Sequence, residues 1–176
     1  MGSKGTPMLD QLRAMFPHVN ASAPASTAMI RLPGQPDSVR RARMFTRTTL
    51  QDWRLPEHFD TVALVVSELV TNALRYGLDA LPRHDGGTGE RGLPPSAGAE
   101  TAVELELMRY ARRLICAVRD GSEAPPEIST EDGAADPAAE SGRGLYLVDC
   151  FSDGWGWRPL TGDRRGKVVW AVFQTG

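Results

Sequence analysis

Residues 65–77 have the sequence VVSELVTNALRYG, and the organisation of the chain follows from this segment. At about 100° per residue, its apolar side chains fall on one arc of a helix, and that arc must pack against a core. Glu68 and Asn72 are four residues apart, so they lie next to each other at the border of the arc, with Arg75 close to Glu68. The spacing predicts a helix with a carboxylate, a carboxamide and a guanidinium along one edge of its buried face. The apolar arc consists of Val62, Val65, Val66, Leu69, Val70 and Ala73.

The chemistry of this edge suits a phosphate ligand with its metal ion. Carboxylate and carboxamide oxygens are ligands for a hard cation such as Mg²⁺, and both the cation and an Arg side chain bind phosphate. A second interpretation is that Glu68 and Asn72 are solvated residues at the boundary of the apolar arc. The helix alone leaves both interpretations open.

Length and composition define the general class of the protein. The 176 residues are enough for one domain with a core. Lys and Arg (20) nearly balance Asp and Glu (22), and the net charge of -2 argues against a general electrostatic attraction to nucleic acid. We see no signal peptide and no run of about 18 apolar residues, so we expect a cytoplasmic protein without a membrane segment. Cys116 and Cys150 lie beside apolar residues and are predicted to be small core residues, not metal ligands.

The remaining segments predict a single domain after a tail. Residues 1–27 are predicted to be a flexible tail because residues 20–27 are all small or proline, and residues 28–176 form the domain. The predicted strands are 28–32, 101–109, 114–118, 155–159 and 167–173. The predicted helices are 37–53, with Asp37 as the cap, 56–77 and 142–151. The polar segments 78–100 and 122–141 are predicted to be flexible loops.

Helices come early in this order and strands cluster late. We therefore expect an α+β fold, a two-layer sandwich with helices on one face of a mixed, mostly antiparallel sheet.

Two further motifs follow the helix. Asp120-Gly121 ends an apolar strand, where a carboxylate can accept hydrogen bonds from a base edge or an amine, although Asp-Gly also commonly marks a turn. Gly142-Arg143-Gly144 begins a helix, where glycines let a ligand approach the backbone and free N–H groups can bind an anion. Neither motif is a Rossmann or Walker fingerprint. Each alone has ordinary structural explanations.

The order of the motifs is more specific than any one of them. ELVTNALRYG, VRDGSEAPP, GRGLYLVDCFSDGWGW and GKVVWAVF follow one another along the chain. This series resembles the histidine-kinase-like ATPase superfamily, and in particular the small bacterial anti-sigma factor serine/threonine kinases, over residues 28–173. The resemblance implies a Bergerat-type ATP-binding fold, which agrees with the sandwich predicted above.

The resemblance also implies roles for single residues, with ATP and Mg²⁺ as cofactors. Glu68 would be the catalytic general base, Asn72 the metal ligand and Asp120 the residue that recognises adenine. Residues 124–141 would form the ATP lid. Arg143 has a second interpretation, a salt bridge between this lid and the following helix. The residues implied in cofactor binding are Asn72, Arg75, Asp120, Gly121, Gly142, Arg143 and Gly144.

The function implied by the resemblance is phosphoryl transfer from ATP to a Ser or Thr of an anti-anti-sigma protein, with a sigma factor as the alternate partner. Relatives commonly form dimers, so a homodimer is also implied. A competing hypothesis is a catalytically silent regulator that keeps the fold and sequesters a partner. A two-component sensor is a third, disfavoured because no phosphoacceptor helix pair with a suitable His precedes the domain.

Three positions depart from the family pattern. Tyr76 replaces a common His, and Ser122-Glu123-Ala124 replaces a segment with a second glycine. Val168 occupies the place where many relatives have a Thr that helps the Asp to hold adenine. Tyr76 can still donate a hydrogen bond, so this change is mild. Val168 and the Ser122-Glu123-Ala124 segment favour the silent regulator, whereas Glu68 and Asn72 favour the kinase.

Overall fold

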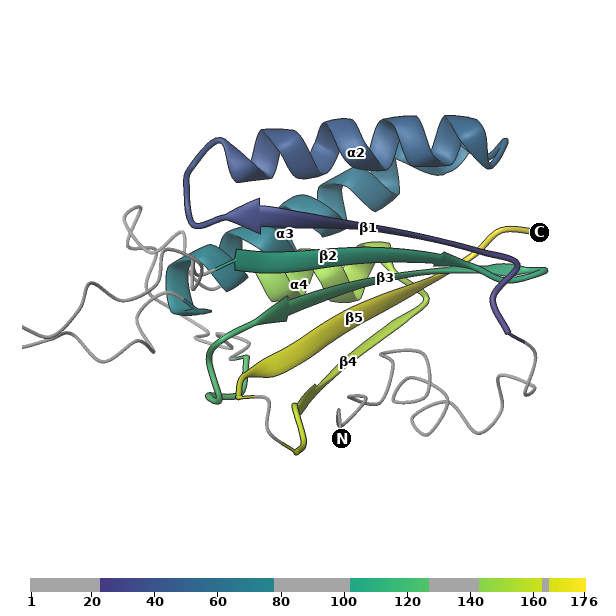
Figure 1. The fold of residues 1–176 in the computed structure, drawn as a ribbon. Coiled ribbons are helices and arrows are strands. Elements are labelled where there is room, and N and C mark those ends of the chain that lie inside the picture. Colours follow the sequence, from purple (N-terminus) through teal and green to yellow (C-terminus); the bar gives the residue numbers. More distant parts are fainter. Residues whose placement is uncertain (1–22, 78–101, 127–142, 163–164) are drawn as a thin grey trace, which may run out of the picture.

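The computed structural model describes residues 23–77, 102–126, 143–162 and 165–176 (Figure 1). The strands are β1 (Ser26–Pro33), β2 (Ala102–Arg109), β3 (Arg113–Asp120), β4 (Gly154–Pro159) and β5 (Lys167–Gln174). The helices are α2 (Ser38–Asp52), the short 3₁₀ helix η1 (Pro56–His58), α3 (Phe59–Gly77) and α4 (Arg143–Phe151). The predicted loop 78–100 and most of the predicted lid 124–141 lie outside the described residues. No helix in the described ranges is both long and apolar enough to cross a bilayer.

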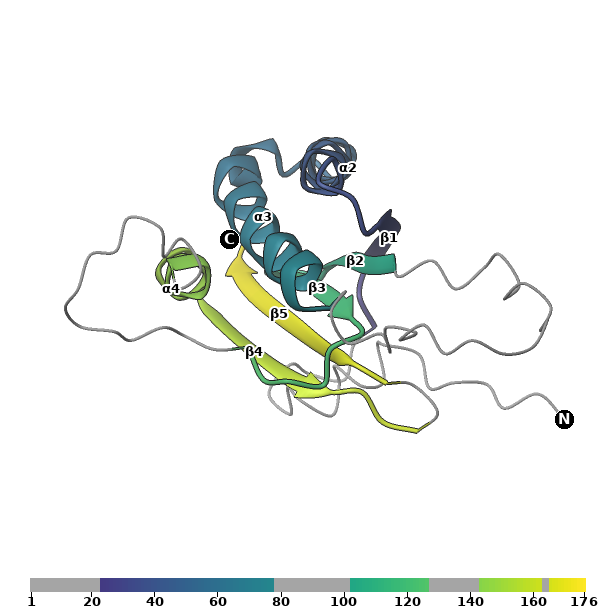
Figure 2. The ribbon, with the colours of Figure 1, turned by 90° about the vertical axis from the view of Figure 1, so that its left-hand side faces the viewer.

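The five strands form one sheet with the order β1-β2-β3-β5-β4. Figure 2 shows α2, α3 and α4 on the same face of this sheet. The predicted two-layer α+β sandwich is therefore confirmed. All four pairs of neighbouring strands are antiparallel, so the described strands include no parallel pair of the kind that a mixed sheet would contain. β1 begins two residues earlier than predicted, because Ser26 and Thr27 already pair with β2.

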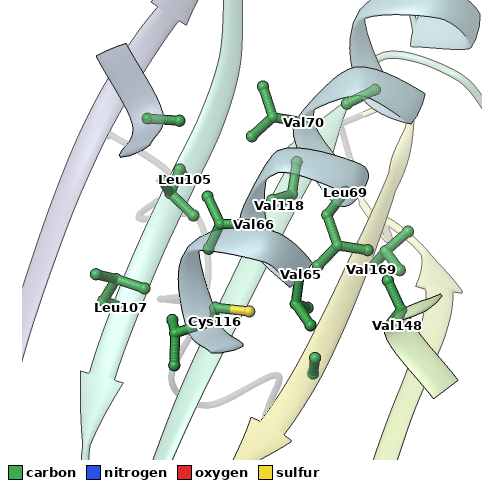
Figure 3. Close-up of a cluster of buried hydrophobic side chains, with 14 of the residues drawn as sticks. Val65, Val66, Leu69, Val70, Leu105, Leu107, Cys116, Val118, Val148 and Val169 are labelled. Carbon is green, nitrogen blue, oxygen red and sulfur yellow. The ribbon is translucent and has the colours of Figure 1, made fainter. Parts of the chain in front are cut away.

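The main core lies between α3 and the sheet (Figure 3). The apolar arc predicted for this helix is buried, and its side chains meet those that point toward the helices from β2, β3 and β5. Each fully buried Val or Leu contributes about 1.5–3 kcal/mol relative to an exposed one. This packing holds α3 in a fixed position over the sheet. The core residues labelled in Figure 3 are Val65, Val66, Leu69, Val70, Leu105, Leu107, Cys116, Val118, Val148 and Val169.

A second apolar cluster lies on the opposite face of the sheet. It is formed by Met108, Ile115, Ala117, Val168 and Trp170. The central strands β3 and β5 are therefore buried on both faces, which explains why their sequences are nearly continuous apolar runs. The interpretation of the tryptophans as sheet-packing residues is confirmed, since each packs against one of the two clusters.

One prediction made from local sequence is wrong, and another is confirmed only in part. Cys116 is buried as expected, but Cys150 is exposed, because it lies about 200° around α4 from the buried Val148. Asp37 occupies the N-cap position of α2 but makes no side-chain cap hydrogen bond. The start of α2 is instead linked to the end of β1 by Ser38, whose hydroxyl donates a hydrogen bond to the carbonyl oxygen of Pro33 at 2.5 Å.

Candidate functional site

A cavity of about 260 Å³ lies between the C-terminal half of α3 and the adjoining ends of β3 and β5. Its volume is close to the lower limit of about 300 Å³ for small-molecule sites. Asn72 and Asp120 both line it, so the structure brings together the first and second predicted motifs. The lining residues are Leu69, Asn72, Ala73, Tyr76, Asp120, Ser122, Ala124, Pro125, Pro126, Leu145, Lys167 and Val169.

Asp120 is the last residue of β3, and its side chain is only 2% exposed. Its Oδ1 accepts a hydrogen bond from the backbone N–H of Ser122 at 2.8 Å and one from Lys167 Nζ at 3.0 Å. Burial raises the pKa of the Asp120 carboxyl, and Lys167 and the Ser122 N–H oppose this rise. Both hydrogen bonds end on the same oxygen. Oδ2 is therefore the oxygen of Asp120 that remains to accept a bond from a ligand.

Lys167 is a site residue that sequence reasoning missed. It is the direct register partner of Asp120 across the β3–β5 ladder, and its side chain is 6% exposed. The expectation that Val168 stands beside the Asp is wrong, because Val168 belongs to the cluster on the opposite face of the sheet. Side chains alternate between the faces of a strand, so only one of these two neighbours can face the cavity. A lysine, not a valine, is thus the residue next to the carboxylate.

Gly166 fixes the backbone beside Asp120. Its φ is +115°, and an added Cβ would overlap the Asp120 carbonyl oxygen and lie 3.0 Å from Gly121 Cα. A side chain is therefore excluded both by conformation and by space. The sequence signal for this role is the glycine directly before Lys167. Gly121 itself is exposed, and the turn after β3 is closed by the Asp120–Ser122 hydrogen bond.

The third motif lies against the edge of α3. A Cβ at Gly144 would lie 2.8 Å from Glu68 Oε2 and 3.5 Å from the amide atoms of Asn72. The absence of a side chain at Gly144 thus lets the start of α4 approach Glu68 and Asn72 closely. The first and third motifs are adjacent.

The other predicted site residues contribute less to this geometry. Arg75 is exposed, and neither Arg75 nor Glu68 is among the described residues that line the cavity. Arg143 begins α4, but its side chain lies outside the described structure, as does the whole of Gly142.

The donor set near α3 fits Mg²⁺ only in partnership with a phosphate ligand. In the described part of the chain, no group of three or more His, Cys, Asp or Glu residues is placed to hold a metal ion. The side-chain oxygens of Asn72 and Glu68 are the hard donors at this edge. Mg²⁺ commonly takes one or two protein ligands and completes its shell with water and substrate phosphates. The residues present match that pattern.

A histidine kinase-like ATPase domain matches the chain over residues 32–173, so the protein belongs to the histidine kinase-like ATPase family. This class agrees with the two-layer fold and with a cavity between its layers. None of the curated proteins matches the chain. Among solved structures, the chain is similar in fold to a chain of the SiaB-SiaC complex from Pseudomonas aeruginosa. The TM-score is 0.54 at 16% identity, and the match covers 96% of this chain and 100% of that one.

Proposed function

We propose that this domain binds ATP with Mg²⁺ and acts as an anti-sigma regulatory factor that phosphorylates a Ser or Thr of an anti-anti-sigma protein. The observation that supports this best is the shared cavity of Asn72 and Asp120, beside the close approach of Gly144 to Glu68. Membership of the family supports a nucleotide as the ligand. The similarity to a chain crystallised as a SiaB-SiaC complex supports a partner protein.

Each residue has a distinct task in this proposal. Asp120 binds the base through Oδ2, and Asn72 supplies an amide oxygen for the metal ion. Glu68 accepts the proton of the attacking hydroxyl or orients it, because a carboxylate within hydrogen-bond reach can act as a general base. Backbone N–H groups at the start of α4 stabilise negative charge on the phosphates. Bound ATP would supply the phosphoryl group, and Mg²⁺ would neutralise charge on its oxygens.

Phosphate transfer to purified anti-anti-sigma proteins from radiolabelled ATP tests the kinase. The wild-type chain should label a Ser or Thr of one such partner, and Glu68→Gln should lose about 100-fold or more of the rate. Glu57→Gln is the matched control, since Glu57 is an exposed carboxylate of η1, away from the cavity. Equal rates for wild type and Glu68→Gln would remove Glu68 from the mechanism.

The Asp120–Lys167 ion pair favours a second candidate function, the catalytically silent regulator. A carboxylate that is already paired has less capacity to bind a base, so the cavity would then be structural. Calorimetric titration with ATP, with and without Mg²⁺, separates the two candidates. Mg²⁺-dependent binding that is lost in Asp120→Asn supports the kinase. An absence of binding at millimolar ATP supports the silent regulator, and pull-down of sigma factors should then identify its partner.

A further inference from the structure

Lys167 is a buried cation with unused hydrogen-bonding capacity. A lysine ammonium has three N–H donors and no acceptor. One donor bonds Asp120 Oδ1 at 3.0 Å, and the side chain is 6% exposed while it lines the cavity. A buried charge requires further partners, since an unsatisfied donor loses its hydration without compensation. The remaining donors of Lys167 are therefore available to an acceptor in the cavity.

Asp120 provides the complementary group at the same place. The Ser122 N–H and Lys167 both bond Oδ1, which leaves Oδ2 as an acceptor. The ion pair thus presents one acceptor and at least one donor side by side to the cavity. The two residues are register partners in neighbouring strands, so the sheet itself fixes their separation.

We propose that Lys167 is a specificity-determining residue, which donates a hydrogen bond to N1 of an adenine base while Asp120 Oδ2 accepts one from the N6 amine. The Watson–Crick edge of adenine has this acceptor and this donor adjacent to each other. This inference rests on the proposed nucleotide-binding function. In this inference the Asp120–Lys167 ion pair recognises the base, whereas in the silent regulator the same pairing weakens the binding of a base.

The same geometry rejects other purines. Guanine and hypoxanthine have an N1–H donor and a carbonyl oxygen at position 6, which reverses the pattern of the adenine edge. The N1–H of these bases would face the Lys167 ammonium, and their carbonyl oxygen would face the Asp120 carboxylate. A site of buried polar groups discriminates strongly when it leaves such groups unpaired.

Ligand analogues test this inference on the unmodified protein. In 1-deaza-ADP the N1 acceptor is replaced by a C–H group, whereas 7-deaza-ADP keeps N1 and serves as the matched control. Calorimetry should show that 1-deaza-ADP binds about tenfold or more weakly than ADP, the scale of a hydrogen bond from a charged donor. The control should bind about as well as ADP, and IDP should bind at least as weakly as 1-deaza-ADP.

A substitution then assigns the effect to Lys167. Lys167→Met keeps much of the side-chain length but removes every N–H donor, so the ratio between ADP and 1-deaza-ADP should fall to about one. Equal binding of ADP and 1-deaza-ADP by the wild-type chain overturns the role of Lys167 and leaves nucleotide binding intact. A wild-type chain that binds no ADP at all overturns the proposed function as well. Since the ligand comparison needs no variant, poor folding of Lys167→Met does not affect it.

Discussion

Gly166→Ala tests whether the backbone beside the cavity lined by Asp120 is as constrained as the structure indicates. Gly166 has a φ of +115°, which costs an L residue about 1–3 kcal/mol. The new Cβ would also overlap the Asp120 carbonyl oxygen, and forced overpacking typically adds about 1–3 kcal/mol. Alanine also lowers the conformational entropy of the unfolded chain, which offsets about 0.4–1 kcal/mol of this destabilisation. The central values give a net destabilisation of about 3 kcal/mol.

Gly162→Ala is a matched control because it separates the two causes. Gly162 has a φ of +80°, but a Cβ there would meet nothing within 4 Å. Only conformational strain of about 1–2 kcal/mol applies, less the same entropic gain, so the loss should be about 1 kcal/mol or less. Gly154→Ala is a second control, since Gly154 has neither a positive φ nor a neighbour within 4 Å.

Urea unfolding followed by circular dichroism measures these differences. With an m value of about 2 kcal/mol/M, the midpoint should fall by about 1.5 M for Gly166→Ala and by at most about 0.5 M for Gly162→Ala. ADP affinity should fall in parallel for Gly166→Ala, because the carbonyl that must move belongs to Asp120. Midpoints of the two variants that agree within about 0.3 M, well under the expected difference of about 1 M, would refute the predicted overlap.

Three further outcomes follow from single side chains. A thiol reagent should label the exposed Cys150 in the native protein. Burial raises the pKa of Cys116 to about 12, so the thiol of native Cys116 should react more than about a thousandfold more slowly than that of Cys150. The variant Cys150→Ser should therefore be labelled only when it unfolds. Burial raises the pKa of Glu106 above 4.5, so its ionisation destabilises the fold as pH rises through that raised value. In urea melts, the free energy of unfolding of Glu106→Gln should therefore increase relative to that of wild type between about pH 4 and about pH 7. A difference between the two proteins that does not change with pH would contradict this prediction. Gly144→Ala should change the free energy of unfolding by less than about 1 kcal/mol, because the new Cβ would meet only the flexible end of the Glu68 side chain. The same variant should slow phosphate transfer about tenfold or more. A normal rate would show that this contact has no role in catalysis.

The helices, the strands and the two-layer arrangement could be predicted from the sequence, because each helix and strand is marked by a local pattern of apolar residues. The helical period of α3 predicted its buried face, and every predicted strand and helix in the described ranges is present. The predicted boundaries agree to within about two residues for most elements, because capping and breaking residues mark them.

The partner of Asp120 was not predictable in the same way. Asp120 and Lys167 are 47 residues apart, and their contact depends on the register of β3 against β5. A strand with one polar face reveals its register through alternation, but β5 is buried on both faces. Its apolar run therefore does not show which residues face the cavity, and the family pattern alone pointed to Val168 where the register places Lys167. The exposure of Cys150 was missed because a short helix end offers too few residues to define its buried arc.

The cavity has one wall in the helical layer and one in the sheet. A ligand within it contacts α3 on one side and β3 and β5 on the other, so it binds the assembled sandwich and not the unfolded chain. At a free concentration 100 times its dissociation constant, such a ligand increases the free energy of unfolding by about 2.7 kcal/mol. With ATP as the ligand, the lifetime of this protein against proteolysis would rise and fall with the energy charge of the cell.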